Sequence, residues 1–259
     1  MSYVTVDNEP LYYRLSANDL AGRKPPLVLI HGAGGTHMHW PAALRRLADR
    51  TVYAIDLPGH GKSKGSGRDS IDAYREVVYA FCQALNLDRI VLAGHSMGSA
   101  ITLDFALHYP QRLAGIILVG SGARLRVAPA ILDGIRSDFP ATAKLIAEWT
   151  HDPHAAEQLK RMYVQRLLEN DPNVLYGDFF ACDHFDLRAD LPRIQTPVLV
   201  LCGTTDQMTP VKYSEFLVQN LPNARLALLP GAGHMVMLEA PEDTAAAAEE
   251  FLGEVAGGK

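Results

Sequence analysis

The sequence predicts an α/β fold with a mostly parallel eight-stranded sheet, flanking helices and one helical insertion. Short apolar runs alternate with longer segments of helical periodicity, which is typical of a parallel sheet. One interval, residues 120–198, is far longer than the roughly thirty residues of a strand-helix-strand unit. The length of 259 residues suits a single α/β core that carries such an insertion.

Eight short segments are the predicted strands. Residues 3–6 and 11–15 are expected to pair as an antiparallel hairpin at the edge of the sheet. The other six are apolar runs that are too short for ordinary helices and are expected to lie parallel. They are residues 27–30, 51–55, 90–93, 116–120, 198–202 and 226–229.

Helices are predicted in the intervals between these runs. The expected ranges are 41–48, 70–85, 97–108, 211–219 and 241–255. The last begins well, because Pro241 suits the first helical position and the acidic Glu242 and Asp243 complement the helix dipole.

Residues 122–192 are predicted to form a helical cap, with residues 1–121 and 193–259 as the core. The insertion carries apolar residues at helical spacing, among them Ile131, Ile135 and Phe179. Each of these residues alone is expected to pack the cap onto the core. Together they are also expected to roof a mostly apolar pocket.

Composition excludes several classes of protein. The net charge is −5 and both signs are interspersed, so the chain has neither a basic stripe for nucleic acid nor a polybasic segment for a membrane surface. Residues 1–7 lack a secretory signal and no apolar run approaches a membrane span, so a cytoplasmic protein is expected. Three widely spaced cysteines, Cys82, Cys182 and Cys202, suggest neither a disulfide framework nor a zinc site.

Ser96 is the most informative residue of the chain. It stands in Gly-His-Ser-Met-Gly, residues 94–98, between an apolar run and a helical segment. A serine hydroxyl becomes a useful nucleophile when a sharp turn exposes it and a base removes its proton. The glycines two residues on either side make that turn sterically possible. We therefore predict Ser96 as a catalytic nucleophile.

A serine nucleophile needs a histidine as its base and a carboxylate that orients the histidine. Asp206 follows the apolar run 198–202, and His234 stands in a glycine-rich loop between the last predicted strand and the last helix. Both positions fall at the carboxyl end of the sheet, where sites of open α/β folds gather. We predict Asp206 and His234 as the partners of Ser96.

Two backbone N–H groups are expected to stabilise the oxyanion that forms on the substrate. One is the N–H of Met97, and the other belongs to the glycine-rich loop His-Gly-Ala-Gly-Gly at 31–35, where Ala33 is the predicted donor. Gly32 and Trp40 are expected to lie beside the substrate.

Other readings of these residues are disfavoured. The glycine loop is not a dinucleotide fingerprint, because His37 stands where the third glycine is required. The histidine pairs at 37 and 39 and at 151 and 154 lack cysteine or carboxylate ligands at a recognised zinc spacing, so no metal site is predicted. His60, in the segment 56–63, is interpreted as structuring its turn.

These motifs together resemble the α/β-hydrolase superfamily over essentially the whole chain. The resemblance rests on the loop 31–35, the segment 56–63, the pentapeptide 94–98, the stretch 203–206 with Pro210, and Gly233-His234. The order serine, aspartate, histidine is also that of this superfamily. The resemblance implies a serine esterase-like member with a helical cap, a Ser96, Asp206 and His234 triad, and no metal or organic cofactor.

The predicted function is hydrolysis of a small to medium, largely apolar carboxylic ester through an acyl-enzyme. Serine at position 96 disfavours the related enzymes that use an aspartate nucleophile. A lactonase or a carbon-carbon bond hydrolase on the same triad is the enzymatic alternative, and a slow-turnover ligand receptor is the alternative from another class. Arg124 and Arg126, expected at the cap entrance, favour a carboxylate-bearing substrate only if they are not simply a solvated basic corner.

Overall fold

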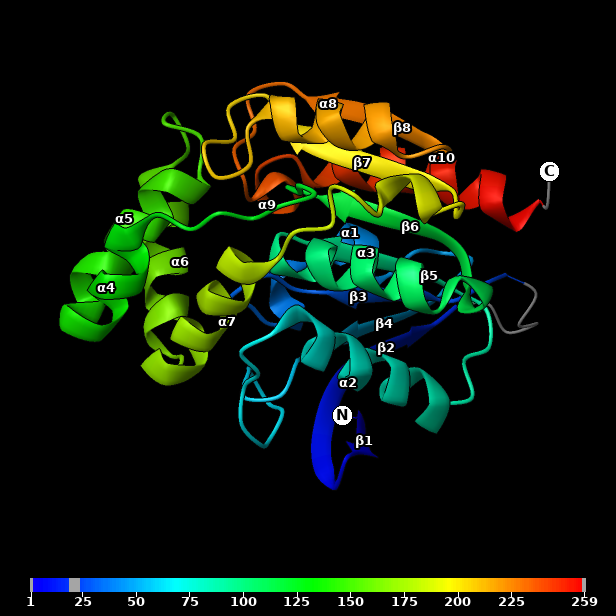
Figure 1. Cartoon of the computed structure of the whole chain (residues 1–259), viewed down its shortest axis with the longest axis horizontal. Coiled ribbons are helices and arrows are strands. Elements are labelled where there is room, and N and C mark those ends of the chain that lie inside the picture. Colours follow the sequence, from blue (N-terminus) through cyan, green and yellow to red (C-terminus); the bar gives the residue numbers. More distant parts are fainter. Residues whose placement is uncertain (1, 19–23, 258–259) are drawn as a thin grey trace.

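The computed structural model describes residues 2–18 and 24–257 and contains one eight-stranded sheet (Figure 1). The strand order is β1-β2-β4-β3-β5-β6-β7-β8, with β1 antiparallel to β2, β2 antiparallel to β4, and all other neighbours parallel. The strands are β1 Ser2–Val6, β2 Glu9–Ala17, β3 Leu27–Ile30, β4 Thr51–Ile55, β5 Ile90–His95, β6 Leu113–Val119, β7 Val198–Gly203 and β8 Ala224–Leu229. The predicted mostly parallel sheet and its antiparallel edge hairpin are confirmed.

The helices lie on both faces of the sheet and at one end of it (Figure 1). The α-helices are α1 Ala42–Arg45, α2 Ile71–Ala84, α3 Met97–His108, α4 Pro129–Ser137, α5 Phe139–Thr150, α6 Glu157–Leu168, α7 Pro172–His184, α8 Val211–Asn220, α9 Val236–Glu239 and α10 Pro241–Ala256. Short 3₁₀ helices are η1 His37–His39, η2 Pro110–Arg112 and η3 Leu191–Arg193.

Both faces of the central strands are buried, which explains their continuous apolar sequences. In β3, Val28 and Ile30 belong to a core cluster with α2, α3 and α8, whereas Leu27 and Leu29 belong to a second cluster with α1, α9 and α10. Alternate residues of a strand point to opposite faces, so one apolar run serves two cores.

Most predicted elements differ from the structure by one or two residues at an end, and three differences are larger or informative. The strand predicted at 116–120 begins earlier, at Leu113, because Gly115 interrupts the apolar run without ending the strand. Glycine is required there by the Phe251 ring of α10, since a Cβ would lie 2.9 Å from that ring. The strand predicted at 226–229 begins at Ala224 and includes the half-buried Arg225 of an edge strand. The helix predicted at 41–48 is only four residues long, Ala42–Arg45.

The inserted segment contains four helices, α4 to α7, which form a group at one end of the sheet (left in Figure 1). Its apolar residues are not a separate core. Ile131, Ile146 and Leu175 belong to the same buried cluster as β3 and α10, and Phe185 belongs to the cluster with α2 and α3. The insertion is therefore packed continuously with the sheet domain.

Candidate active site

Ser96 occupies a strained turn between β5 and α3. Its φ of 53° and ψ of −115° are unusual for a residue with a side chain, and a positive φ of this kind costs on the order of 1–3 kcal/mol. A Cβ on Gly94 would lie 2.0 Å from the Gly98 carbonyl oxygen, so this close backbone approach requires glycine at position 94. A Cβ on Gly98 would lie 2.4 Å from the Ile30 carbonyl oxygen, so position 98 requires glycine for its packing on the end of β3. The strand-turn-helix context expected for Ser96 is present, with the side chain half-buried.

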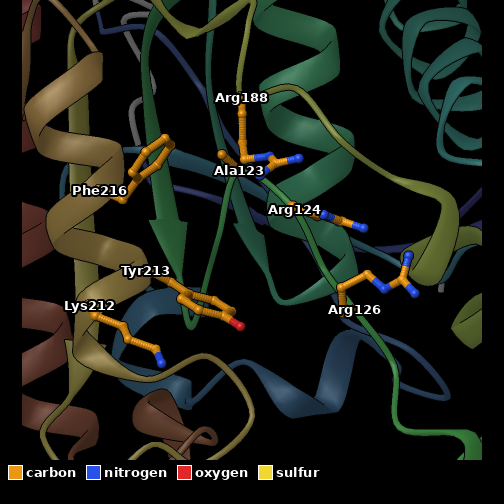
Figure 2. Close-up of a pocket in the computed structure, with 7 residues that line it drawn as sticks. All are labelled: Ala123, Arg124, Arg126, Arg188, Lys212, Tyr213 and Phe216. Carbon is orange, nitrogen blue, oxygen red and sulfur yellow. The ribbon is translucent and has the colours of Figure 1, made fainter.

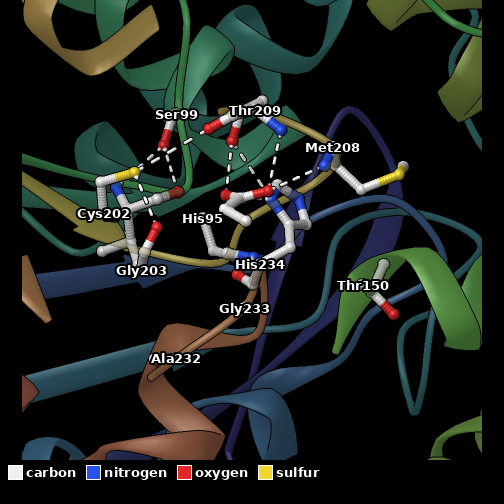
Figure 3. A network of polar contacts seen from close by, with 12 residues as sticks. His95, Ser99, Thr150, Cys202, Gly203, Met208, Thr209, Ala232, Gly233 and His234 are labelled. Atoms are coloured by element: carbon white, nitrogen blue, oxygen red, sulfur yellow. Dashed lines mark hydrogen bonds and ion pairs between the residues drawn. The ribbon is translucent and has the colours of Figure 1, made fainter. Parts of the chain in front are cut away.

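His234 and Asp206 form a buried pair at the same end of the sheet. Figure 3 shows His234 with Thr209 and Met208, which belong to the same network of polar contacts. His234 Nδ1 lies 2.9 Å from Asp206 Oδ2. The carboxylate also accepts the N–H groups of Met208 and Thr209, at 2.9 and 2.8 Å, and the Thr209 hydroxyl at 2.8 Å. These three hydrogen bonds hold the Asp206 carboxylate in place, so it is a fixed acceptor for a proton on His234 Nδ1. A proton on Nδ1 leaves Nε2 with the lone pair that a base requires.

Asp206 is held in its charged form. Burial alone would raise the pKa of its carboxyl, but the charge and hydrogen bond of His234, with the N–H and hydroxyl of Thr209, hold that pKa below its usual value. Asp206 therefore presents a negative charge to the imidazole, which favours the imidazolium that forms when a base takes a proton.

The His234 ring lies against the ends of β5 and β6, where it contacts His95, the residue before Ser96. A Cβ on Gly120, which follows β6, would lie 3.0 Å from His234 Nδ1. The ring centroids of His95 and His234 are 4.9 Å apart, and His95 Nε2 is 3.0 Å from the His234 carbonyl oxygen. Within the described ranges the Ser96 hydroxyl itself makes no hydrogen bond. Catalytic hydrogen bonds are often long in free enzymes and tighten when substrate binds.

The glycine-rich loop after β3 packs directly on the turn that carries Ser96. A Cβ on Gly32 would lie 3.1 Å from the Ser96 Cβ. The Gly32 carbonyl accepts the Gly35 N–H at 3.0 Å and lies 2.8 Å from His31 Nδ1. In a trans peptide the C=O and N–H point in opposite directions, so anchoring this carbonyl also sets the direction of the Ala33 N–H.

Two observations bear on which N–H groups are free for a ligand. The Gly34 N–H already donates to Asp178 Oδ2 at 2.8 Å and is not free for a ligand, so the Ala33 N–H stays the predicted oxyanion donor. Met97 is the first residue of α3, where an N–H has no partner inside the helix and the helix dipole favours negative charge.

His31 ties this loop to the segment after β4. Its Nδ1 donates to the Gly32 carbonyl, and its Nε2 accepts the Leu57 N–H at 3.0 Å. Burial, assisted by the charge of His60, lowers the pKa of His31 to about 3. The ring is therefore neutral, with its two nitrogens in opposite roles, and it links two loops at the site.

The remaining predicted residues are placed as follows. Met97 is fully buried, and Trp40 is 1% exposed within the cluster that includes Leu44 and Leu47. Contact of Trp40 with a substrate stays a prediction. One histidine of each pair, 37 and 39 or 151 and 154, is bonded locally: His37 Nδ1 lies 2.8 Å from Asp56 and His151 Nδ1 lies 2.9 Å from the Ala147 carbonyl oxygen.

Sequence reasoning missed Thr209 and Asp178. Thr209 lies only three residues after Asp206, a spacing at which a side chain can return to a carboxylate. Asp178 shares a helix face with the buried Leu175, Phe179 and Cys182, so an acidic residue at a buried helical position was the available signal.

A pocket of about 380 Å³ lies where the chain leaves β6 toward the insertion, next to α8 (Figure 2). It is lined by Ala123, Arg124, Arg126, Arg188, Lys212, Tyr213 and Phe216. Arg124 Nε is 3.7 Å from Asp186, and Arg126 Nε is 3.3 Å from Asp183. The two arginines expected at the cap entrance are thus already paired with carboxylates of this chain.

Comparison with known proteins decides the family. The family model of the alpha/beta hydrolase fold matches residues 25–241. The chain belongs to this family. A solved structure described as a thermophilic esterase superposes with a TM-score of 0.87 and 31% identity, covering 98% of this chain and 97% of that one.

Two curated relatives show the range of activities around this α/β hydrolase. A pimeloyl-[acyl-carrier protein] methyl ester esterase of Nitrosomonas europaea is 27% identical, over 86% of this chain and 94% of that protein. A dihydrolipoyllysine-residue acetyltransferase component of the acetoin cleaving system of Pseudomonas putida is 35% identical over 84% of this chain. The chain spans 60% of the length of that second protein. Together with the fold, the esterases among the relatives support a hydrolase.

No helix in the described part is both long and apolar enough to cross a bilayer.

Proposed function

We propose that this α/β hydrolase cleaves a small to medium, largely apolar carboxylic ester, with Ser96 as nucleophile, His234 as base and Asp206 as the carboxylate that orients it. The observation that carries the proposal is the buried His234–Asp206 pair held against the strand ends beside the strained, glycine-flanked Ser96. Ester cleavage is favoured over other acyl chemistry by similarity to the two esterases named above.

The reaction follows from the roles of these groups. His234 Nε2 takes the Ser96 proton as the hydroxyl oxygen attacks the ester carbonyl, and the Ala33 and Met97 N–H groups stabilise the oxyanion. The tetrahedral intermediate collapses, the alkoxide leaves with the proton from His234, and an acyl group remains on Ser96. A water molecule then gives His234 a proton and attacks the acyl carbonyl, forming a second tetrahedral intermediate. This intermediate collapses, Ser96 Oγ leaves with the proton from His234, and the acid is released.

The inserted helices α4 to α7 are proposed as the cap that shapes the acyl or alkyl pocket. The insertion reaches the oxyanion loop directly, since Leu175 and Leu167 lie against Gly34. Side chains of α5 and α6, such as Ile146 and Tyr163, belong to the buried cluster on that side. An apolar roof of this kind favours uncharged substituents.

The test is a series of p-nitrophenyl esters of graded acyl length, assayed with the wild type and with Ser96→Ala. We expect turnover by the wild type with a maximum at a short or medium acyl chain. Ser96→Ala is expected to lose turnover by about 10⁶-fold. Ester binding without turnover by the folded wild type would instead indicate a ligand receptor, and a preference for vinylogous diketones would indicate a carbon-carbon bond hydrolase.

A further inference from the structure

Asp178 is a buried carboxylate that the inserted helix α7 directs toward three segments of the core. It has no exposed surface. Oδ2 accepts the Gly34 N–H at 2.8 Å and lies 2.7 Å from His60 Nε2. Oδ1 accepts the Tyr74 hydroxyl at 2.6 Å. One side chain thus joins the insertion to the glycine loop after β3, the loop after β4 and helix α2.

His60 makes this contact an ion pair. Its Nδ1 is 3.0 Å from the Pro58 carbonyl oxygen, which can only accept, so Nδ1 carries a proton. Its Nε2 faces the Asp178 carboxylate, which accepts a second hydrogen bond from the ring, so Nε2 also carries a proton. Burial alone would lower the pKa of His60, but the charge and hydrogen bond of Asp178 raise it above its usual value. The doubly protonated ring and the carboxylate satisfy each other in a site without water access.

The insertion contacts Gly34 through both backbone polar groups and beside its Cα. Asp178 takes its N–H, and Asn170 Nδ2 donates to its carbonyl at 3.0 Å. A Cβ on Gly34 would lie 2.6 Å from Leu175 Cδ1 and 3.0 Å from Leu167 Cδ2. Gly34 has a φ of +62°, which only glycine adopts at low cost, so this close packing and this backbone shape depend on each other.

We propose that Asp178 is a positioning residue for the oxyanion donor Ala33. The contact of the insertion with the glycine loop is then required for catalysis as well as for enclosing the substrate. The inference rests on the proposed function. The Gly32 carbonyl fixes the peptide before Ala33, and Asp178 fixes the peptide after it through the Gly34 N–H. Loss of Asp178 frees the second peptide. Loss of an oxyanion donor costs about 10²–10³ in kcat, and a displacement of about 1 Å costs up to about 10².

The test compares Asp178→Ala, Asp178→Asn and a control on the same helix, Asp183→Ala, all as the full chain. The assays use a p-nitrophenyl ester and an aryl trifluoromethyl ketone, whose serine adduct carries an oxyanion. Asp178→Ala is expected to lower kcat by roughly 10- to 100-fold, to change KM by less than about threefold, and to raise the ketone Ki in parallel with the loss of kcat. Asp178→Asn keeps one acceptor oxygen for Gly34 and is expected to lie between Asp178→Ala and the wild type.

Asp183→Ala controls for loss of an α7 carboxylate, because Asp183 accepts the Val127 N–H at 3.0 Å and is not bonded to the glycine loop. Its kcat is expected to stay within about twofold of the wild type. A folded Asp178→Ala whose kcat and ketone Ki match those of Asp183→Ala would overturn the proposal. If Asp178→Ala does not fold, Asp178→Asn and Tyr74→Phe decide, and unchanged kcat and Ki in both would also overturn it.

The two proposals fail in different ways. If the wild type neither hydrolyses the esters nor binds the ketone, the proposed function is wrong. If the wild type does both and the Asp178 variants behave like the control, only the positioning role is wrong.

Discussion

At the scale of single residues, His234 can act as a base only if its proton is on Nδ1 and not on Nε2. Asp206→Asn keeps the shape of the side chain but offers His234 Nδ1 an amide that can donate, which favours the proton on Nε2. The base then lacks its lone pair, and kcat is expected to fall by about 10⁴ with little change in KM. Steady-state kinetics on the best p-nitrophenyl ester measure this.

Asp190→Asn is the matched control for that variant, because Asp190 is a partly exposed carboxylate paired with Arg193 outside the site. It is expected to behave as the wild type. If Asp206→Asn retains activity within about tenfold of Asp190→Asn, a different carboxylate orients the base.

Residues were predictable where the local sequence carries the signal. Ser96, Asp206 and His234 each follow an apolar run, so the end of a strand places them without knowledge of the tertiary structure. Asp178 was not predictable in the same way, since its partners Gly34 and His60 lie 144 and 118 positions away in the chain. Which loop N–H stays free for an oxyanion likewise depends on that long-range contact.

At the scale of elements, the effect of replacing a glycine by alanine depends on the space beside its Cα. Gly94→Ala is expected to destabilise the fold by about 1–3 kcal/mol or more and to remove activity, because the added Cβ would lie 2.0 Å from the Gly98 carbonyl oxygen. Gly253→Ala is the control: it lies exposed in the interior of α10, and nothing stands within 4 Å of the added Cβ.

Gly253→Ala is expected to raise the free energy of unfolding by about 0.5–1 kcal/mol, the cost of glycine inside a helix. Urea unfolding measures both variants. A Gly94→Ala protein with wild-type stability and activity would show that the elbow does not require the close approach described above.

Element boundaries were predicted best where turn chemistry is strong. The helix predicted at residues 97–108 is α3, Met97–His108, because the glycine-flanked turn sets its start. The predicted strand at 116–120 began three residues late because Gly115 breaks the apolar pattern, and the reason for that glycine is the Phe251 ring of a distant helix.

At the scale of the whole molecule, several neutral histidines are buried at the carboxyl end of the sheet. Burial lowers the pKa of His31 to about 3 and, with the nearby Arg166 charge, that of His39 to about 4; burial also lowers the pKa values of His95 and His151. Unfolded histidine titrates near 6.5. Below that pH the unfolded chain binds protons that the folded rings do not, so the free energy of unfolding falls as the pH falls.

The stability contributed by these four rings is complete above about pH 6.5 and is lost progressively toward their folded pKa values. His60, with a raised pKa, acts in the opposite direction, but it is one ring against four. The urea midpoint is therefore expected to decline between about pH 6.5 and 5. His39→Gln should flatten this slope and the exposed His184→Gln should not. A midpoint that is constant or rises toward pH 5 would contradict this account.

The central claim is that Ser96 is activated by a preformed site, and covalent labelling with a fluorophosphonate tests it most directly. After incubation of the wild type and Ser96→Ala, intact-mass and peptide analysis locate the adduct. We predict one adduct on Ser96, none on Ser96→Ala, and slow labelling of Asp206→Asn. A folded wild type that is not labelled, or is labelled on another residue, would contradict the account.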